Sequence, residues 1–103
     1  MNVLTFVGKV SEVPQLKESS QGNKFATMMI EVTRSFANAN GSYDIDMFAV
    51  TLWKGIAETT TAACHVGDWI AVKGRLQSHD YEGKDGMMHR AYDVIAEQVT
   101  IMS

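Results

Sequence analysis

Residues 47–53 read MFAVTLW, and this stretch decides how the rest of the chain is organised. As a β-strand it would send Phe48, Val50 and Leu52 to one face, because side chains alternate along a strand. That apolar face is typical of a core. The opposite face carries the four remaining residues, Met47, Ala49, Thr51 and Trp53. A tryptophan among small and polar neighbours indicates that something flat comes to lie against it.

The segments before this stretch also show strand patterns. Residues 24–36 alternate apolar with polar side chains, and the polar loop 38–44 (NANGSYD) joins them to the strand quoted above. Residues 2–10 (NVLTFVGKV) are almost continuously apolar. Such a run predicts a strand that is covered on both sides, closes a barrel or lies at an oligomer interface. Pro14 marks a bend, and residues 18–23 (ESSQGN) have the composition of a hairpin turn.

The alternation stops after Trp53. Residues 54–65 place four side chains at helical spacing, namely Ile56, Thr60, Ala63 and Cys64. Three consecutive threonines make this a weak helix by propensity, so tertiary packing must hold it. Gly67 stands where the C-terminus of a helix favours a left-handed residue. We predict a short helix that plugs the barrel.

Alternation resumes over residues 68–81. The side chains expected to point inward are Ile70, Val72 and Leu76. Those of the opposite parity are Lys73, Arg75 and Tyr81. This assignment holds as long as a bulge at Gly74 does not reverse the register. Residues 82–90 read as a long hairpin tip, and residues 91–102 as a last strand whose parity shifts before Val99 and Ile101.

Three strands, a helix and two strands, in this order, are typical of an OB-fold. The sequence therefore predicts an all-β protein, a five-stranded Greek-key barrel with one short helix between strands 3 and 4. With 103 residues the chain forms a single domain, 1–103, around one core. The outer face and loops of such barrels bind oligonucleotides or oligosaccharides.

The composition narrows the function classes further. A lone Cys64 forbids an internal disulfide, and the chain has neither a signal peptide nor an apolar run near the ~20 residues that span a bilayer. We therefore expect a cytoplasmic, nucleoid-associated protein without a membrane partner. No phosphate-cradling glycine motif occurs, and the three histidines lack the spacing of a zinc site. We expect neither an enzyme, nor a metal, nor a cofactor.

Aromatic residues and cations coincide at three places: Phe36 beside Arg34, Trp53 beside Lys54, and Tyr81 downstream of Lys73 and Arg75. Bases stack on aromatic faces for about 1–3 kcal/mol each, and cations follow the phosphates. Neither interaction demands a particular base sequence. The net charge of −3 argues against a nucleic-acid partner, but phosphates respond to charges within roughly 8 Å more than to the total. The pattern indicates sequence-independent binding of single strands.

The chain also resembles the DNA-binding domain of bacterial single-stranded DNA-binding proteins, over essentially its whole length. The resemblance rests on short matches in order: residues 2–8, Pro14, Arg34-Ser35-Phe36, Leu52-Trp53, Ala57-Glu58, Gly67 and Gly74-Arg75-Leu76. It implies four base-stacking positions, which fall on Phe36, Met47, Trp53 and Tyr81. We expect four cations to meet phosphates, namely Arg34, Lys54, Lys73 and Arg75. Met47 departs from the tryptophan frequent in the family, which implies weaker binding at that subsite.

The resemblance further implies a homotetramer with the first strand at a subunit interface, a dimer being the alternative. It also implies a role in replication, recombination or repair, in contact with the proteins of those pathways. The family's flexible tail with its acidic end is absent from this chain, which stops at Ser103, so the sequence is either trimmed or that of a tailless relative. The alternative hypothesis is an OB-fold adaptor that resembles primosomal replication protein N and chiefly docks other proteins. Net acidity and Met47 favour this alternative.

Overall fold

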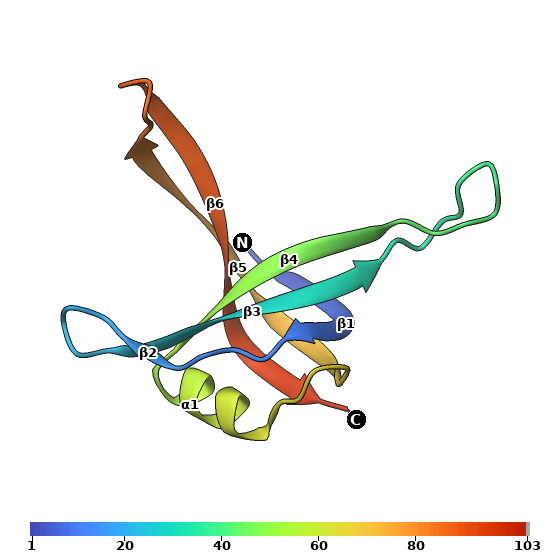
Figure 1. Ribbon diagram of the computed structural model, residues 1–103, viewed down its shortest axis with the longest axis horizontal. Helices are drawn as coiled ribbons and strands as arrows, with labels where there is room; N and C mark the ends of the chain where they lie inside the picture. Colours follow the sequence, from blue (N-terminus) through green and yellow to red (C-terminus); the bar gives the residue numbers. More distant parts are fainter. Residues whose placement is uncertain (103) are drawn as a thin grey trace.

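The computed structural model describes residues 1–102 as a closed β-barrel with one helix (Figure 1). The elements are, in chain order, β1 (Leu4–Glu12), β2 (Lys17–Glu18), β3 (Lys24–Thr33), β4 (Ile45–Trp53), α1 (Lys54–Ala63), β5 (Trp69–Glu82) and β6 (Met88–Ile101). The five long strands lie in the order β1-β5-β6-β4-β3, and β3 returns to pair with β1. This arrangement confirms the predicted OB-fold. The short strand β2, which pairs with the start of β3, was not predicted.

The core lies inside the barrel and consists of alternate residues of the long strands together with α1. Its members are Val10, Ala26, Met28, Ile30, Val50, Leu52, Ala57, Cys64, Ile70, Val72 and Ala96. The alternation predicted for β3 and β4 is confirmed, with one exception at Phe48, which was expected in the core. Phe48 remains 37% exposed and packs on Phe6 with ring centroids 5.4 Å apart. The prediction of a buried Phe48 is wrong because β4 extends past the core at this end.

β1 closes the barrel by changing partners along its length. Residues 4–9 pair with β5, and from Lys9 onward the strand pairs with β3 through Lys9↔Glu31 and Val10↔Ile30. Gly8 lies where the two partners meet. A Cβ atom at this position would overlap the backbone oxygen of Glu31 and the side chain of Ile30. The close approach of β1 to β3 therefore requires glycine.

Helix α1 covers one end of the barrel and packs against β3, β4 and β6 (Figure 1). Ala57 and Thr60 are buried there. The helix ends at Ala63, because Cys64 turns extended to place its side chain in the core. Gly67 has the expected left-handed conformation, with φ +91°, but it lies in the following turn and donates its N–H to the carbonyl of Val10 at 2.9 Å. Its predicted place at the helix terminus is wrong.

Two hairpins project from the barrel, one formed by β3 and β4 and the other by β5 and β6 (Figure 1). The radius of gyration is 15.3 Å, against about 13 Å for a compact chain of this length. The β5–β6 arm is paired out to Glu82↔Met88, so its tip is shorter than the predicted 82–90 loop. Leu76, predicted inward, is 44% exposed because it stands on this arm beyond the core.

A bulge in β6 accounts for the predicted change of parity in the last strand. Lys73 pairs with Gln98 and Gly74 with Ala96, which leaves Glu97 as the extra residue. Since the extra residue belongs to β6, the alternation along β5 runs unbroken through Gly74. Among the described residues, no helix is long and apolar enough to cross a membrane.

Candidate nucleic-acid interface

The outer face of the β3–β4 hairpin carries two of the predicted stacking residues. Trp53, at the end of β4, is 39% exposed and lies opposite Phe25 of β3, with ring centroids 5.3 Å apart. Met47 is exposed on the same face, opposite Glu31. Trp53 follows Met47 by six positions along the strand, which corresponds to about 20 Å at roughly 3.4 Å per residue. They form two separate subsites. The contribution of Phe25 was missed, because only the strand register shows it.

The third stacking candidate, Phe36, lies in the loop that joins β3 to β4 and is 66% exposed. Hydrogen bonds within the loop keep it compact. The N–H of Asn38 donates to the carbonyl of Ser42 at 2.7 Å, and the Asn38 amide donates to Asp44 at 3.0 Å. Tyr43 is also exposed in this loop. Sequence analysis did not single out this second ring, although the residue stands in the same polar segment.

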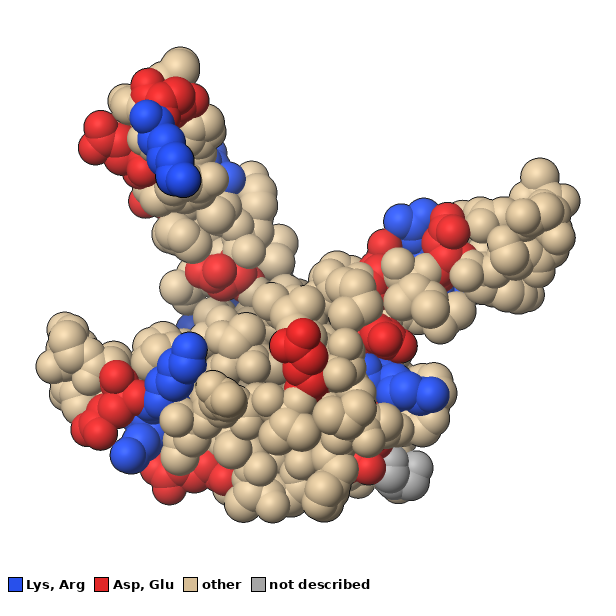
Figure 2. Space-filling model, viewed as in Figure 1, with Lys and Arg blue, Asp and Glu red and all other residues tan. Residues whose placement is uncertain are grey.

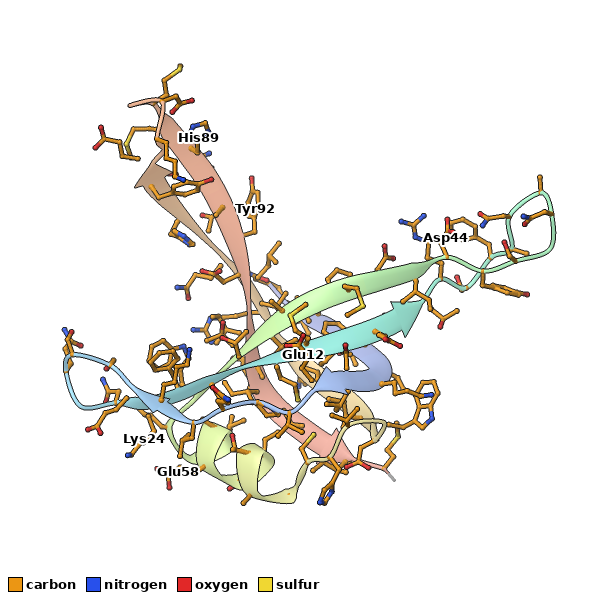
Figure 3. All side chains as sticks on the ribbon, viewed as in Figure 1. Glu12, Lys24, Asp44, Glu58, His89 and Tyr92 are labelled. Atoms are coloured by element: carbon orange, nitrogen blue, oxygen red, sulfur yellow. The ribbon has the colours of Figure 1, made fainter. Side chains whose placement is uncertain are left out.

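The fourth candidate, Tyr81, stands on the β5–β6 arm rather than on the barrel. Its ring lies between two imidazoles: that of His89, stacked with centroids 5.6 Å apart, and that of His79, tilted at 6.2 Å. Figure 3 shows His89 near the end of this arm. Both histidines were set aside in the sequence because no metal site could be formed. For His79, the strand alternation could have indicated this position, since a residue two places before Tyr81 lies on the same face of the strand.

The strand registers place three of the four candidates, Met47, Trp53 and Tyr81, on the same side of the sheet. Thr51 of β4 pairs with Ile95 of β6, and Ile95 pairs with Arg75 of β5. Alternation therefore places the outward side chains of β3, β4, β6 and β5 on one continuous face, which extends along the arm to Tyr81. Lys73 lies on this face as well. The two hairpins diverge (Figure 1), and the side chains of Met47, Trp53 and Tyr81 are exposed.

Carboxylates already engage Arg34, one of the four predicted phosphate contacts. Asp46 accepts a hydrogen bond from Nε of Arg34 at 3.0 Å and a second one from a terminal nitrogen of the same guanidinium at 2.9 Å. Asp44 lies 3.4 Å from the other terminal nitrogen. Figure 3 shows Asp44 on this hairpin. The hydrogen bonds from Arg34 lower the pKa of Asp46, so the carboxylate stays ionised below the usual range. A phosphate would have to displace two acidic groups to reach this guanidinium.

The other two arginines are paired in the same way. Arg75 lies 3.6 Å from Glu97, and Arg90 donates to Asp80 at 3.1 Å. Figure 2 shows acidic groups beside the cations on both projecting hairpins. Within residues 1–102, Lys54 and Lys73 form no ion pair. These two lysines are therefore the immediately available cations among the four predicted.

Lys54 also has an unusual backbone. Its φ of +54° lies in the left-handed region, which costs a residue with a Cβ atom about 1–2 kcal/mol. It directly follows Trp53, so the chain turns from β4 into α1 through a strained residue. Strain of this kind is often retained where a side chain must be aimed.

The comparison with known proteins shows the family of the chain. The Single-strand binding protein family matches residues 1–102. The chain belongs to this family. It is 35% identical to single-stranded DNA-binding protein B of Bacillus subtilis (strain 168), over 98% of the chain and 89% of that protein. It is 33% identical to the single-stranded DNA-binding protein of Bacillus cereus, over 99% of the chain but 60% of that protein.

A third relative, single-stranded DNA-binding protein 2 of Staphylococcus aureus (strain Mu50), is 31% identical over 99% of the chain and 72% of its own length. The match to the Single-strand binding protein family confirms the family inferred from the sequence motifs. It also confirms the prediction of a binding protein rather than an enzyme. The identities of the stacking and phosphate-contacting residues stay a prediction.

The thiol of this single-strand binding family member lies away from the outer face. Cys64 is buried in the core, and burial raises the pKa of its thiol, which keeps it protonated and a poor nucleophile. Among the described residues, no group of His, Cys, Asp and Glu side chains is arranged to hold a metal ion.

Proposed function

We propose that this protein binds single-stranded DNA without sequence preference and protects exposed strands in the cytoplasm during replication, recombination or repair. The observation that carries this proposal is the continuous outer face, on which the Trp53–Phe25 pair and the Tyr81 ring remain accessible. Aromatic faces accept every base, because every base has a π-face. The strand would follow the outside of the barrel from one hairpin to the other.

Each predicted site residue then has a role. Phe36, Trp53 and Tyr81 stack bases, and Met47 packs against a base or a sugar. Lys54 and Lys73 meet phosphates directly. Arg34 and Arg75 meet them after exchanging their carboxylate partners. Binding therefore relies more on stacking than on charge, which fits a protein with a net charge of −3.

The proposed assembly is a homotetramer, and the outer face of β1 and β5 supports it. Three apolar side chains, Val7, Trp69 and Met102, are exposed on neighbouring strands, and the Lys9 ammonium lies over the Trp69 ring, 5.4 Å from its centroid. The first half of β1 pairs with β5 alone, so its other backbone edge is open to a second chain. Light scattering on the purified protein gives the number of subunits.

Fluorescence of the two tryptophans tests the function. In the variant Trp69→Phe, Trp53 is the only reporter, and oligo-dT of several tens of nucleotides should quench its emission, with added salt partly reversing the effect. Trp53→Ala should weaken binding by about 1–3 kcal/mol, measured by anisotropy of labelled oligo-dT. Unchanged emission of Trp69→Phe at low salt, together with unchanged anisotropy, would exclude the proposal.

A second candidate function is an adaptor that docks replication proteins and binds DNA weakly. The pairing of all three arginines with carboxylates favours it, because little free positive charge is left for phosphates. A dimer in light scattering, and displacement of a labelled oligonucleotide by a replication protein, would support this alternative.

A further inference from the structure

The β5–β6 arm holds a row of three rings on one face. Tyr81 pairs directly across the arm with His89, and His79 stands two residues before Tyr81 on the same strand. The imidazole of His89 is stacked on the Tyr81 ring, and that of His79 contacts it at an angle of 47°. All three side chains are between two fifths and one half exposed. The row is therefore a surface feature and not part of the core.

A carboxylate fixes each imidazole in place. Asp93 of β6 lies 2.9 Å from Nδ1 of His79, and Asp85 of the hairpin tip lies 3.1 Å from Nε2 of His89. Asp85 also accepts the backbone N–H of Met87 at 3.0 Å. This bond and that from His89 lower the pKa of Asp85, which keeps it ionised in mild acid.

The charge of the arm opposes DNA binding as long as both histidines are neutral. Residues 76–94 contain four carboxylates, those of Asp80, Glu82, Asp85 and Asp93, and two cations, Lys84 and Arg90. With neutral histidines the arm carries a net charge of −2 and repels phosphates. With both rings protonated its net charge is zero. Histidine is the side chain that changes charge between about pH 5 and pH 8.

Arg75, which pairs with Glu97, stands on the same face at the base of the arm, and the other charged groups near the row lie on the opposite face or at the tip. Asp80 pairs with Arg90 across the arm, with the parity opposite to that of Tyr81 and His89. Glu82 has that same opposite parity, and Lys84 stands at the tip. The amino terminus lies near Leu76 at the base of the arm. Among the charged side chains of residues 1–102, Asp85 and Asp93 are the ones that contact the imidazoles.

We propose that His79 and His89 are nucleic-acid-binding residues, whose rings extend the Tyr81 stacking platform and whose protonated forms attract the phosphates of the bound single strand. Imidazole rings stack on bases as other aromatic side chains do. A unit charge at contact distance from a phosphate in water changes a binding constant by roughly fivefold. The proposal rests on the proposed function, and it adds that DNA binding takes up protons on the arm.

The test is the affinity for oligo-dT that carries a rhodamine label, whose emission does not depend on pH in this range, measured by anisotropy at about pH 8 and about pH 5.5. Thymine gains no proton in this range, so the probe itself does not change. Wild-type protein should bind about five- to tenfold more tightly at the lower pH. The double variant H79Q/H89Q should lose this gain. H79R/H89R, with fixed charges, should bind tightly at both pH values.

His65 supplies the matched control. It also stands beside a carboxylate, 3.6 Å from Asp68, but in the turn after α1 and away from the arm. H65Q should keep the pH profile of the wild type. If H79Q/H89Q folds, by circular dichroism, and keeps that profile, the inference fails while the proposed function stands. Wild-type protein that binds no oligo-dT at either pH overturns both.

Discussion

Removal of Asp46 should strengthen DNA binding, although it breaks the best-formed ion pair on the β3–β4 hairpin. The cluster of Arg34, Asp44 and Asp46 carries a net charge of −1, and Asp46 occupies two of the guanidinium donors, at 3.0 Å and 2.9 Å. Asp46→Asn leaves the cluster neutral and frees Arg34 for a phosphate. We expect roughly three- to fivefold tighter binding to oligo-dT at moderate salt, the effect of about one contact charge in water.

The salt dependence gives a second measure of the same change. For single strands, log K falls with log[salt] by about 0.7 for each phosphate neutralised. Asp46→Asn should therefore steepen the slope by about 0.7 per protomer, measured by anisotropy titrations across a salt series. Because hydrogen bonds from Arg34 lower the pKa of Asp46, the pair is intact at neutral pH and is lost only below the usual range of a carboxyl group. Measurements near pH 7 thus compare a fully formed pair with its absence.

Asp80→Asn is the control variant. It removes the same charge and frees another arginine, Arg90, but on the face of the arm opposite to Tyr81. Its affinity should rise less than that of Asp46→Asn, because only the net charge of the arm changes, and its salt slope should stay close to that of the wild type. If Asp46→Asn binds no more tightly than Asp80→Asn, only net charge matters and the assignment of Arg34 to the interface is refuted.

Two further substitutions test the stacking surface and the barrel. Met47→Trp should tighten binding of oligo-dT by about 1–2 kcal/mol in anisotropy titrations, because an exposed ring replaces a thioether on the outer face; unchanged affinity would remove position 47 from the interface. Gly8→Ala should lower the free energy of unfolding in urea by about 1–3 kcal/mol, since its Cβ would overlap Glu31 and Ile30. Gly55→Ala, whose Cβ would meet nothing, should be neutral or stabilising, and equal effects at the two glycines would contradict the account of barrel closure.

The barrel could be predicted from the sequence because its core follows local periodicity. Met28, Ile30, Val50 and Leu52 alternate with outward residues, and each is fully buried. Periodicity alone does not show where a strand leaves the core. Leu76 has the parity of Ile70 and Val72 but stays exposed, because it stands on the arm beyond the core.

The composition of the stacking surface could be predicted more fully than its electrostatics. Trp53 and Tyr81 stand out as single aromatic residues on polar faces, and the structure leaves both exposed. The pairing of Arg34 with Asp46 depends on the β3–β4 register, which brings together residues twelve positions apart. The sequence shows the charges but not their pairing, so Arg34 reads as a free cation until the strands are aligned.

The structure of the β5–β6 arm affects how bound single-stranded DNA would be held. Beyond Leu76 its backbone hydrogen bonds are, within residues 1–102, those between β5 and β6, and most side chains of both strands are exposed. Such a ribbon opens locally at a lower free energy than the barrel, so its amides should exchange with solvent first. Single-stranded DNA that binds to both the arm and the barrel would slow the exchange of these amides. Part of the stacking free energy would then offset the cost of ordering the arm. The platform can then adjust to the path of the DNA, which is what a protein indifferent to base sequence requires.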